Sequence, residues 1–235
     1  MNSEFIEKAV DLLKTIDEEE KDSIAAAGTL IADSIMAKGI IIAFGSGHSV
    51  VGAKELVQRA GGLFAAKRIN DPSEGMFEVL PGTGELLMKR VEVKPEDVVF
   101  VISNSGRNPE GIEIALIAKE KGAKVVAVTG VQSSKQLTSK HASGKLLYQI
   151  ADVVLDMHTP AGDAAIAVEG VEGNVCGIST ITTAAILQAS VLYAIKLMVK
   201  RGYTPPVRIS KNLSEAAIKR SEEIEKNYAD RVFRF

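Results

Sequence analysis

The apolar positions in the first part of the chain recur with the period of a helix. Over residues 3–37 they fall on one face, as the 3.6-residue repeat of an amphipathic helix requires. A charged run over residues 17–22 interrupts the stripe, and we interpret it as a kink or turn with a solvated surface. The first members of the stripe are Ile6, Val10, Leu13 and Ile16. The pattern predicts an N-terminal helical arm over about residues 1–37.

Five short apolar runs rich in β-branched residues then break the helical period. Such runs are typical of strands that a parallel sheet buries on both faces. The expected strands are residues 40–44, 63–66, 98–102, 125–128 and 153–155. The helices expected between and after them are residues 50–60, 109–121, 178–200 and 214–228. This alternation predicts an α/β fold, a three-layer αβα sandwich around a five-stranded parallel sheet with right-handed crossovers.

The chain carries more helix than one sheet needs for cover. Gly202 and the pair Pro205-Pro206 end the long apolar helix, and Ser214 is a favoured N-cap for a final polar helix. We expect one domain over residues 1–235, with a C-terminal helical tail over about residues 203–235. The surplus helical surface predicts a homodimer or homotetramer whose helices pack between subunits.

Composition narrows the class of protein. The chain is 46% hydrophobic and 25% charged with a net charge of −2, so it can form a core and has no basic excess for nucleic acid. A single cysteine, Cys176, excludes an internal disulfide framework and suits a reducing compartment. The acidic N-terminus does not resemble a secretory signal, and Lys196 interrupts the apolar run 175–199. We therefore expect a cytoplasmic protein without a membrane or nucleic-acid partner.

Two loops rich in serine and glycine follow the first and third expected strands. Residues 45–49 read Gly-Ser-Gly-His-Ser, and residues 103–106 read Ser-Asn-Ser-Gly. The carboxyl ends of parallel strands meet at one sheet edge, which is where α/β proteins bind ligands. Hydroxyl groups and unpaired backbone N–H groups there favour a phosphate, with its negative charge and acceptor oxygens. The paired loops therefore predict a phosphate site.

Two nucleotide-binding motifs resemble the first loop only in part. The dinucleotide fingerprint needs a third glycine where this chain has Val50. The P-loop needs Gly-Lys-Ser/Thr, but Ala53-Lys54-Glu55 follows Gly52. Neither motif accounts for the second serine loop, so we prefer a phosphate site built from both loops.

These two loops, the helix after the second one and the segment Gly122 to Thr129 together resemble the SIS (sugar isomerase) family over about residues 30–200. The likeness is nearest to uncharacterised bacterial sugar isomerase domain proteins, and phosphoheptose isomerase and N-acetylmuramic acid 6-phosphate etherase are related. The resemblance implies a flavodoxin-like sheet and a phosphorylated sugar as ligand. By position it implies phosphate contacts from Ser46, Gly47, Ser49, Ser103, Ser105 and Asn108. The family more often has Thr or Ser where this chain has Asn108.

Aldose–ketose isomerisation needs a base that moves a proton beside a carbonyl and an acid that opens the ring. The segment Asp71-Pro72-Ser73-Glu74 resembles the Pro-x-Glu segment of arabinose-5-phosphate isomerases, which implies Glu74 as the base. We interpret Glu110, at the start of a helix, as favouring the helix dipole. We expect His141 in its serine-rich stretch to be the acid, and His158 to be structural. Three scattered histidines do not suggest a metal site, and we expect no cofactor.

Three functions remain open from the sequence. An isomerase acting on a phosphosugar is the first, and His48 is then a further substrate contact. The segment Arg107-Asn108-Pro109 resembles the Arg-Thr-Pro of the etherase, and Arg107 could pair with a lactyl carboxylate, which would suit a phosphosugar lyase. A non-catalytic phosphosugar sensor is the third. The polar segment over residues 162–174 is either a lid over the site or a surface turn.

Overall fold

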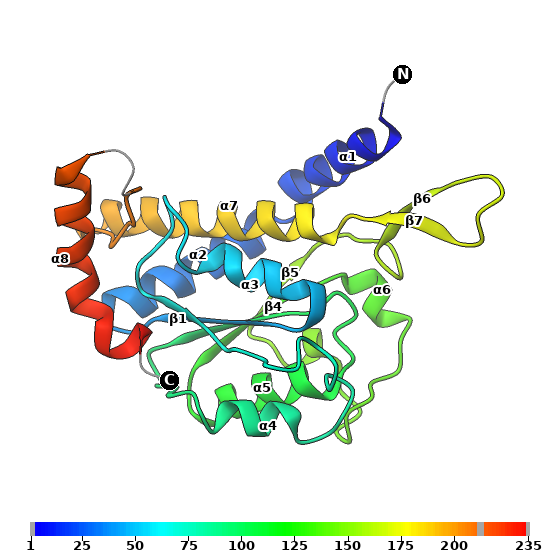
Figure 1. The fold of residues 1–235 in the computed structure, drawn as a ribbon, viewed down its shortest axis with the longest axis horizontal. Helices are drawn as coiled ribbons and strands as arrows, with labels where there is room; N and C mark the ends of the chain where they lie inside the picture. Colours follow the sequence, from blue (N-terminus) through cyan, green and yellow to red (C-terminus); the bar gives the residue numbers. More distant parts are fainter. Residues whose placement is uncertain (1–2, 211–213, 234–235) are drawn as a thin grey trace.

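The structure is a computed structural model that describes residues 3–210 and 214–233. Its main sheet has five parallel strands in the order β2-β1-β3-β4-β5, which is the flavodoxin-like order (Figure 1). The strands are β1 (Ile41–Gly45), β2 (Ala66–Arg68), β3 (Val98–Ile102), β4 (Lys124–Thr129) and β5 (Val153–Asp156). The predicted α/β class and parallel five-stranded sheet are confirmed. The winding direction reverses between β1 and β3, which are hydrogen-bonded neighbours.

Helices cover both faces of the sheet and complete the three predicted layers (Figure 1). On one face lie α4 (Thr83–Met88) and α5 (Pro109–Glu120). On the other lie α2 (Lys21–Met36), α3 (Val50–Leu56) and α7 (Ser179–Lys200). Every residue of β1 and β3 is buried, as expected for strands covered on two sides. The uninterrupted apolar runs of the sequence therefore correspond to the centre of the core.

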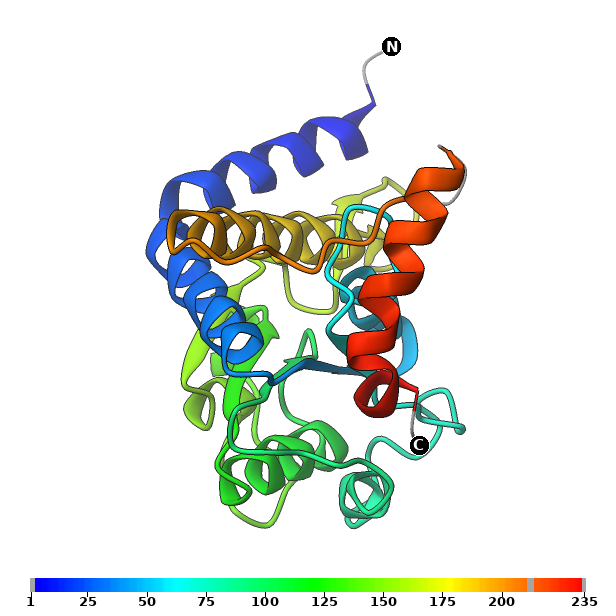
Figure 2. The same ribbon diagram turned by 90° about the vertical axis from the view of Figure 1, so that its left-hand side faces the viewer.

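The predicted arm is two helices. Glu20 separates α1 (Glu4–Glu19) from α2, so the charged run does break the helix. Figure 2 shows α1 lying over α7 on the outside of the helical layer, where Ala9 and Leu12 pack with Ile178. At the other end of the chain is α8 (Glu215–Val232), whose N-cap Ser214 accepts a 3.2 Å hydrogen bond from the N–H of Ala217.

Several local boundaries differ from the predictions. The helix expected over residues 50–60 ends at Leu56, because Val57 is extended. Strand β2 begins later than the expected run 63–66, since the N–H of Phe64 donates to the carbonyl of Pro206 instead. The chain also contains elements that were not predicted: α4, α6 (Val131–Lys135), and an antiparallel hairpin of β6 (Ala164–Ala167) and β7 (Asn174–Gly177).

Helix α7 is the one helix of the described chain whose length and apolar composition would suit a membrane span. Core helices share both properties. Ile186 and Leu187 of α7 are fully buried in the main hydrophobic core, and α7 packs closely against α2 and α3. Its composition is therefore explained by packing inside the helical layer.

The contact between α2 and α7 gives a first testable prediction. Gly28→Ala is expected to destabilise the protein by about 1–3 kcal/mol, through overpacking. An added Cβ would lie 2.7 Å from Cδ1 of Tyr193 and 2.8 Å from the carbonyl oxygen of Ser190, both on α7. Urea denaturation would measure the change in the free energy of unfolding.

Gly111→Ala in α5 is the matched control. The nearest atom to its added Cβ is Cγ1 of Val101 at 3.4 Å, an ordinary contact. Alanine should then raise the free energy of unfolding by up to about 1 kcal/mol, because it favours helix more than glycine does. Equal effects of the two substitutions would contradict close packing of α2 on α7.

Candidate functional site

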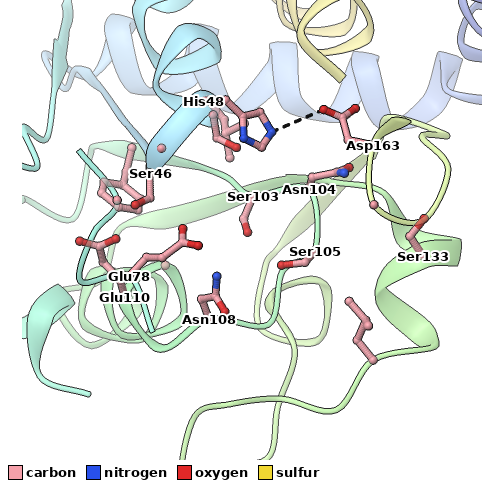
Figure 3. A pocket seen from close by; sticks show the side chains of 18 of the residues that line it. Ser46, His48, Glu78, Ser103, Asn104, Ser105, Asn108, Glu110, Ser133 and Asp163 are labelled. Carbon is pink, nitrogen blue, oxygen red and sulfur yellow. Dashed lines mark ion pairs between the residues drawn. The ribbon is translucent and has the colours of Figure 1, made fainter. Parts of the chain in front are cut away.

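A cavity of about 430 Å³ opens at the carboxyl ends of β1 and β3. Its position is the crevice where the sheet changes winding direction, the usual ligand site of open α/β sheets. Both predicted serine loops line it. Their lining residues are Ser46, Gly47, His48, Ser49, Ser103, Asn104, Ser105 and Asn108. Figure 3 shows the side chains of Ser103, Ser105 and Asn108 gathered around one space. The structure thus brings together all the residues expected to hold phosphate.

The first serine loop turns sharply from β1 into a short 3-10 turn and then α3. An added Cβ on Gly45 would lie 2.3 Å from the carbonyl oxygen of Ser49, so the turn closes only with glycine there. Gly75, at φ +92°, approaches the same loop, and its added Cβ would lie 2.7 Å from the backbone nitrogen of Gly47. The segment after β2 therefore packs directly against the first serine loop.

The second serine loop is held by its neighbours. The N–H of Gly106 donates to Oγ of Ser103 at 3.1 Å. The carbonyl of Asn104 accepts from the N–H of Gly130 and from Oγ1 of Thr129, each at 3.1 Å. These bonds tie the loop to the end of β4 and leave Ser105 facing the cavity (Figure 3). A loop fixed in this way is preorganised for a ligand.

Asn108 is the N-cap residue of α5, but its side chain does not cap the helix. Its Oδ1 atom is buried without a hydrogen-bond partner among the described residues, and its amide group reaches the cavity wall. At the start of α5, Pro109 has no N–H group and the N–H of Glu110 donates to the carbonyl of Glu78 at 3.3 Å. The Asn108 side chain is therefore the group here that is available to an anionic ligand, together with the partial positive charge of the helix N-terminus.

Glu110 lies in surroundings that differ from those expected of a carboxylate that only favours the helix dipole. It lies in the first turn of α5, lines the cavity and is 0% exposed. Neither carboxylate oxygen has a hydrogen-bond partner in the described part of the chain. Burial raises the pKa of Glu110 to about 7, and the charges of Asp71, Glu78 and Glu113 add to the rise. The nearby Ser46 hydroxyl opposes the rise, although it misses the geometry of a full hydrogen bond.

The neighbouring carboxylates have structural partners that Glu110 lacks. Glu113 accepts hydrogen bonds from the N–H groups of Gly82 and Gly84 at 2.7 and 2.8 Å, and so holds the start of α4. Asp71 accepts from the N–H groups of Ser73 and Gly75 at 2.8 and 2.7 Å, and so shapes the segment after β2. Since a buried, unpaired carboxylate costs free energy, its presence in a cavity is a sign of function.

A histidine and a carboxylate face this cavity from another side. Nε2 of His48 lies 3.7 Å from Oδ2 of Asp163, and Figure 3 shows this pair across the cavity from Glu78 and Glu110. Asp163 also accepts hydrogen bonds from the N–H groups of Ile178 and Ser179 at 3.0 and 2.7 Å. The segment that opens the β6–β7 hairpin is thus part of the cavity wall, and α7 fixes its aspartate.

The other predicted residues lie in different surroundings. Glu74 lines the cavity as an exposed side chain with φ +52°. His141 and Arg107 are not among the lining residues; Nδ1 of His141 lies 2.8 Å from Oγ of Ser143. His158 lies 3.0 Å from Glu20 and joins the α1–α2 junction to the end of β5. The structure therefore places Glu110, His48 and Glu74 at the cavity, and His141 outside it.

The sequence of the chain is similar to that of SIS domain proteins. The SIS domain family matches residues 4–130. A UPF0309 protein of Listeria monocytogenes is 46% identical over 233 residues, covering 99% of each chain.

Two solved structures share the fold at lower sequence identity. Phosphoheptose isomerase GmhA of Neisseria gonorrhoeae has a TM-score of 0.55 at 18% identity and covers 83% of this chain and 95% of its own. The Vibrio vulnificus NanR protein complexed with ManNAc-6P has a TM-score of 0.53 at 17% identity and covers 96% of this chain and 67% of its own.

Proposed function

We propose, from the premise that this chain belongs to the SIS domain family, that its cavity binds a phosphorylated sugar and isomerises it. The phosphate would lie against the hydroxyl groups of Ser46, Ser49, Ser103 and Ser105 and the amide of Asn108. Backbone N–H groups of both loops, Gly47 included, would add further donors. This arrangement needs no charged side chain at the phosphate and leaves the acidic side of the cavity for the sugar.

The observation that carries the proposal is the buried, unpaired Glu110 beside the serine loops. A general base works best when its pKa lies near the working pH, and burial raises the pKa of Glu110 to about 7. In the proposed reaction, ionised Glu110 takes a proton from the carbon beside the carbonyl, giving an enediolate whose oxygen receives a proton from a second group. The same carboxyl group then returns the proton to the neighbouring carbon, so the hydrogen count is unchanged.

We assign His48 as the group that exchanges the second proton, between the two oxygen atoms. It reaches the cavity next to Asp163, which would orient the ring. Glu74 at the cavity mouth would contact the sugar, while His141 would need a second subunit to approach the site.

A homodimer or homotetramer in the cytoplasm remains part of the proposal. Exposed apolar side chains on the outer helices support it, among them Ile6, Val10, Leu192 and Val199.

Binding without turnover is the second candidate function. NanR, whose structure contains ManNAc-6P, shares this fold, as does an isomerase. The lyase alternative came from the likeness of residues 107–109 to the etherase; of these, Arg107, the suggested partner of a lactyl carboxylate, does not line the cavity, whereas Asn108 does. NMR of candidate sugar phosphates with the protein in deuterated water separates the candidates. An isomerase produces new sugar signals and incorporates deuterium beside the carbonyl, whereas a sensor changes neither.

Ser105→Ala tests the phosphate site. Sugar phosphates, but not the free sugars, are expected to raise the melting temperature of the wild-type protein. The variant should bind the same ligand about 10–100-fold more weakly, because it loses a hydrogen bond to a charged group. Titration calorimetry would measure the dissociation constants. Ser143→Ala, on an exposed loop outside the cavity, is the matched control and should bind like the wild type. An unchanged affinity in Ser105→Ala would exclude the serine loops as the phosphate site.

A further inference from the structure

A second cavity, of about 880 Å³, lies beside the edge strand β2 and is lined by cations. Among the described residues that line it there is no aspartate or glutamate. The basic lining residues are Lys54, Lys67, Arg68 and Arg90. They come from α3, from β2 and from the segment after α4, and the sequence gives no sign that they meet. We call this space the basic cavity.

Lys67 is the most informative of these cations. Its side chain comes from the middle of β2, and the residue is only 8% exposed. Burial lowers the pKa of Lys67, and the charge of Arg231 lowers it further. The charges of Asp97 and Glu92 act in the opposite direction and offset part of this lowering, but both carboxylates form their ion pairs with Arg231, at 2.7 and 3.2 Å. Within the described chain, Lys67 has no hydrogen bond or ion pair, and its amino nitrogen is not among the fully buried atoms, so an anion in the cavity can reach it.

The other cations of the basic cavity also lack carboxylate partners in the described structure. Arg68 donates to Oδ1 of Asn70 at 2.8 Å, which leaves its charge unpaired. Lys54 and Arg90 are exposed and form no ion pair with any described residue. What distinguishes the basic cavity is the concentration of four cations in one lining that contains no carboxylate among the described residues.

The rest of the wall is apolar. The cavity is within the size range of sites that hold small organic ligands. A wall of this kind suits a ligand that carries a ring or another apolar portion beside its charges. The apolar lining residues are Val57, Ile69, Leu87, Val91, Val232 and Phe233.

We propose that the basic cavity binds a small organic phosphate with several negative charges and an apolar portion, the chemistry of a nucleoside polyphosphate. Its phosphates would pair with Lys67, Arg68 and Arg90, and Lys54 would add to the positive potential. Arginine in particular can bind phosphate oxygens through two parallel hydrogen bonds. The bound anion would supply a partner for the amino group of Lys67, which has none in the described chain.

The basic cavity is connected to the serine-loop cavity by one short segment. Asn70 and Pro72 line the former, whereas Glu74 and Gly75 line the latter. Gly75 is also the residue seated against Gly47 of the first serine loop. A ligand in the basic cavity would therefore contact the segment that forms one wall of the proposed sugar site. The assignment of the basic cavity does not depend on what that site does.

Titration calorimetry with ATP, tripolyphosphate and adenosine tests this proposal on the full chain. We expect saturable binding of ATP, weaker binding of tripolyphosphate and no binding of adenosine. The double variant Arg68→Gln/Arg90→Gln should bind ATP at least about 100-fold more weakly, because each lost charged contact weakens binding about tenfold. Both side chains are at least partly exposed, so the fold should survive.

Lys89→Gln is the matched control, since Lys89 is exposed beside Arg90 but does not line the cavity. Its affinity for ATP should equal that of the wild type. Equal weakening in Lys89→Gln and the double variant would overturn the site, as would the absence of ATP binding. Tripolyphosphate binding as tight as ATP binding would overturn the role of the apolar wall.

Ser105→Ala distinguishes failure of this site from failure of the proposed function. It should weaken the binding of sugar phosphate and leave the affinity for ATP unchanged. The double variant at Arg68 and Arg90 should show the opposite selectivity. Loss of ATP binding in Ser105→Ala would place the anion in the serine-loop cavity and overturn a second site.

Discussion

A Glu110→Gln variant is expected to lose turnover of the phosphosugar by about 10²–10⁴-fold, the contribution of one positioned general base. Glutamine has nearly the same shape and keeps the packing at the start of α5, but it cannot accept the proton. The phosphate contacts from the serine loops are untouched, so affinity for the sugar phosphate should change little. Loss of rate with retained binding would identify Glu110 as the group that acts on the reacting carbon.

The pH dependence of the wild-type rate should carry the signature of Glu110. Only its ionised form can act as a base. Because burial raises the pKa of Glu110 to about 7, turnover should rise with pH through about 7 and then level off. In Glu110→Gln this limb should disappear, leaving a small residual rate without that titration. The measurement is the rate of deuterium incorporation or of isomer formation across the pH range.

The same carboxyl group should affect stability with the opposite trend. The pKa of Glu110 is raised from 4.5 to about 7 on folding, so the folded state binds more protons than the unfolded state between these values. Its favourable contribution is complete below the unfolded value and is lost as pH rises through about 7. Above that pH, Glu110→Gln should be more stable than the wild type by about 2 kcal/mol, after allowing for solvent near the cavity.

Matched variants separate Glu110 from its rivals. Glu74→Gln removes the exposed carboxylate at the cavity mouth and should leave the rise of the turnover rate with pH unchanged. A rate loss confined to Glu74→Gln would instead identify Glu74 as the base. In the same assay, His48→Gln should slow the reaction and His141→Gln should not, unless a second subunit brings His141 to the site. Each variant needs a melting curve, so that loss of rate is not confused with loss of folded protein.

The sequence predicted the sheet well, because each of its central strands is a self-contained apolar run. Strands buried on both faces have no polar positions, and the uninterrupted apolar sequences of β1 and β3 show this directly. The end of α5 was also predictable from Gly122, because this residue adopts φ +85° after the helix, a conformation that favours glycine. Features of this kind depend on a few consecutive residues, which is the range over which a sequence pattern is informative.

Elements that depend on distant partners were missed. Helix α4 has only six residues, and the N–H groups of Gly82 and Gly84 at its start donate to Glu113, which lies 31 and 29 residues further along the chain. The β6–β7 hairpin is fixed in the same manner, through the hydrogen bonds of Asp163 to Ile178 and Ser179 at the start of α7. No local sequence pattern predicts such contacts, so the segments that form α4 and the β6–β7 hairpin resembled loops.

The candidate site also has one part that the sequence predicts and one part that it does not. The serine loops were predictable because glycine and serine after a buried strand already specify a turn rich in donors. The setting of Glu110 was not, because its pKa depends on burial and on Asp71 and Glu78, which lie before α4. From the sequence, Glu74 and Glu110 are two glutamates near Pro residues. Only the fold makes one of them exposed and the other buried without a partner.

Asp97→Ala is expected to cause the largest loss of stability among simple substitutions, about 3–5 kcal/mol. Asp97 is 1% exposed just before β3. Its carboxylate accepts hydrogen bonds from the N–H groups of Ile40 and Lys94 at 2.9 and 2.8 Å, and it pairs with Arg231 of α8 at 2.7 Å. Alanine would leave two backbone donors without their partner and would remove the buried carboxylate from the guanidinium group of Arg231, which would keep only the exposed Glu92 at 3.2 Å.

Asp33→Ala provides the contrast, since it also breaks an aspartate–arginine pair. Asp33 pairs with Arg201 on the surface, where its side chain is 55% exposed, and such pairs contribute at most about 1 kcal/mol. Arg231→Leu should fall between the two, because Asp97 keeps its two backbone bonds. Urea denaturation of the three variants, with limited proteolysis to follow release of α8, measures the order. Equal losses for Asp97→Ala and Asp33→Ala would show that Asp97 does not anchor α8 to the sheet.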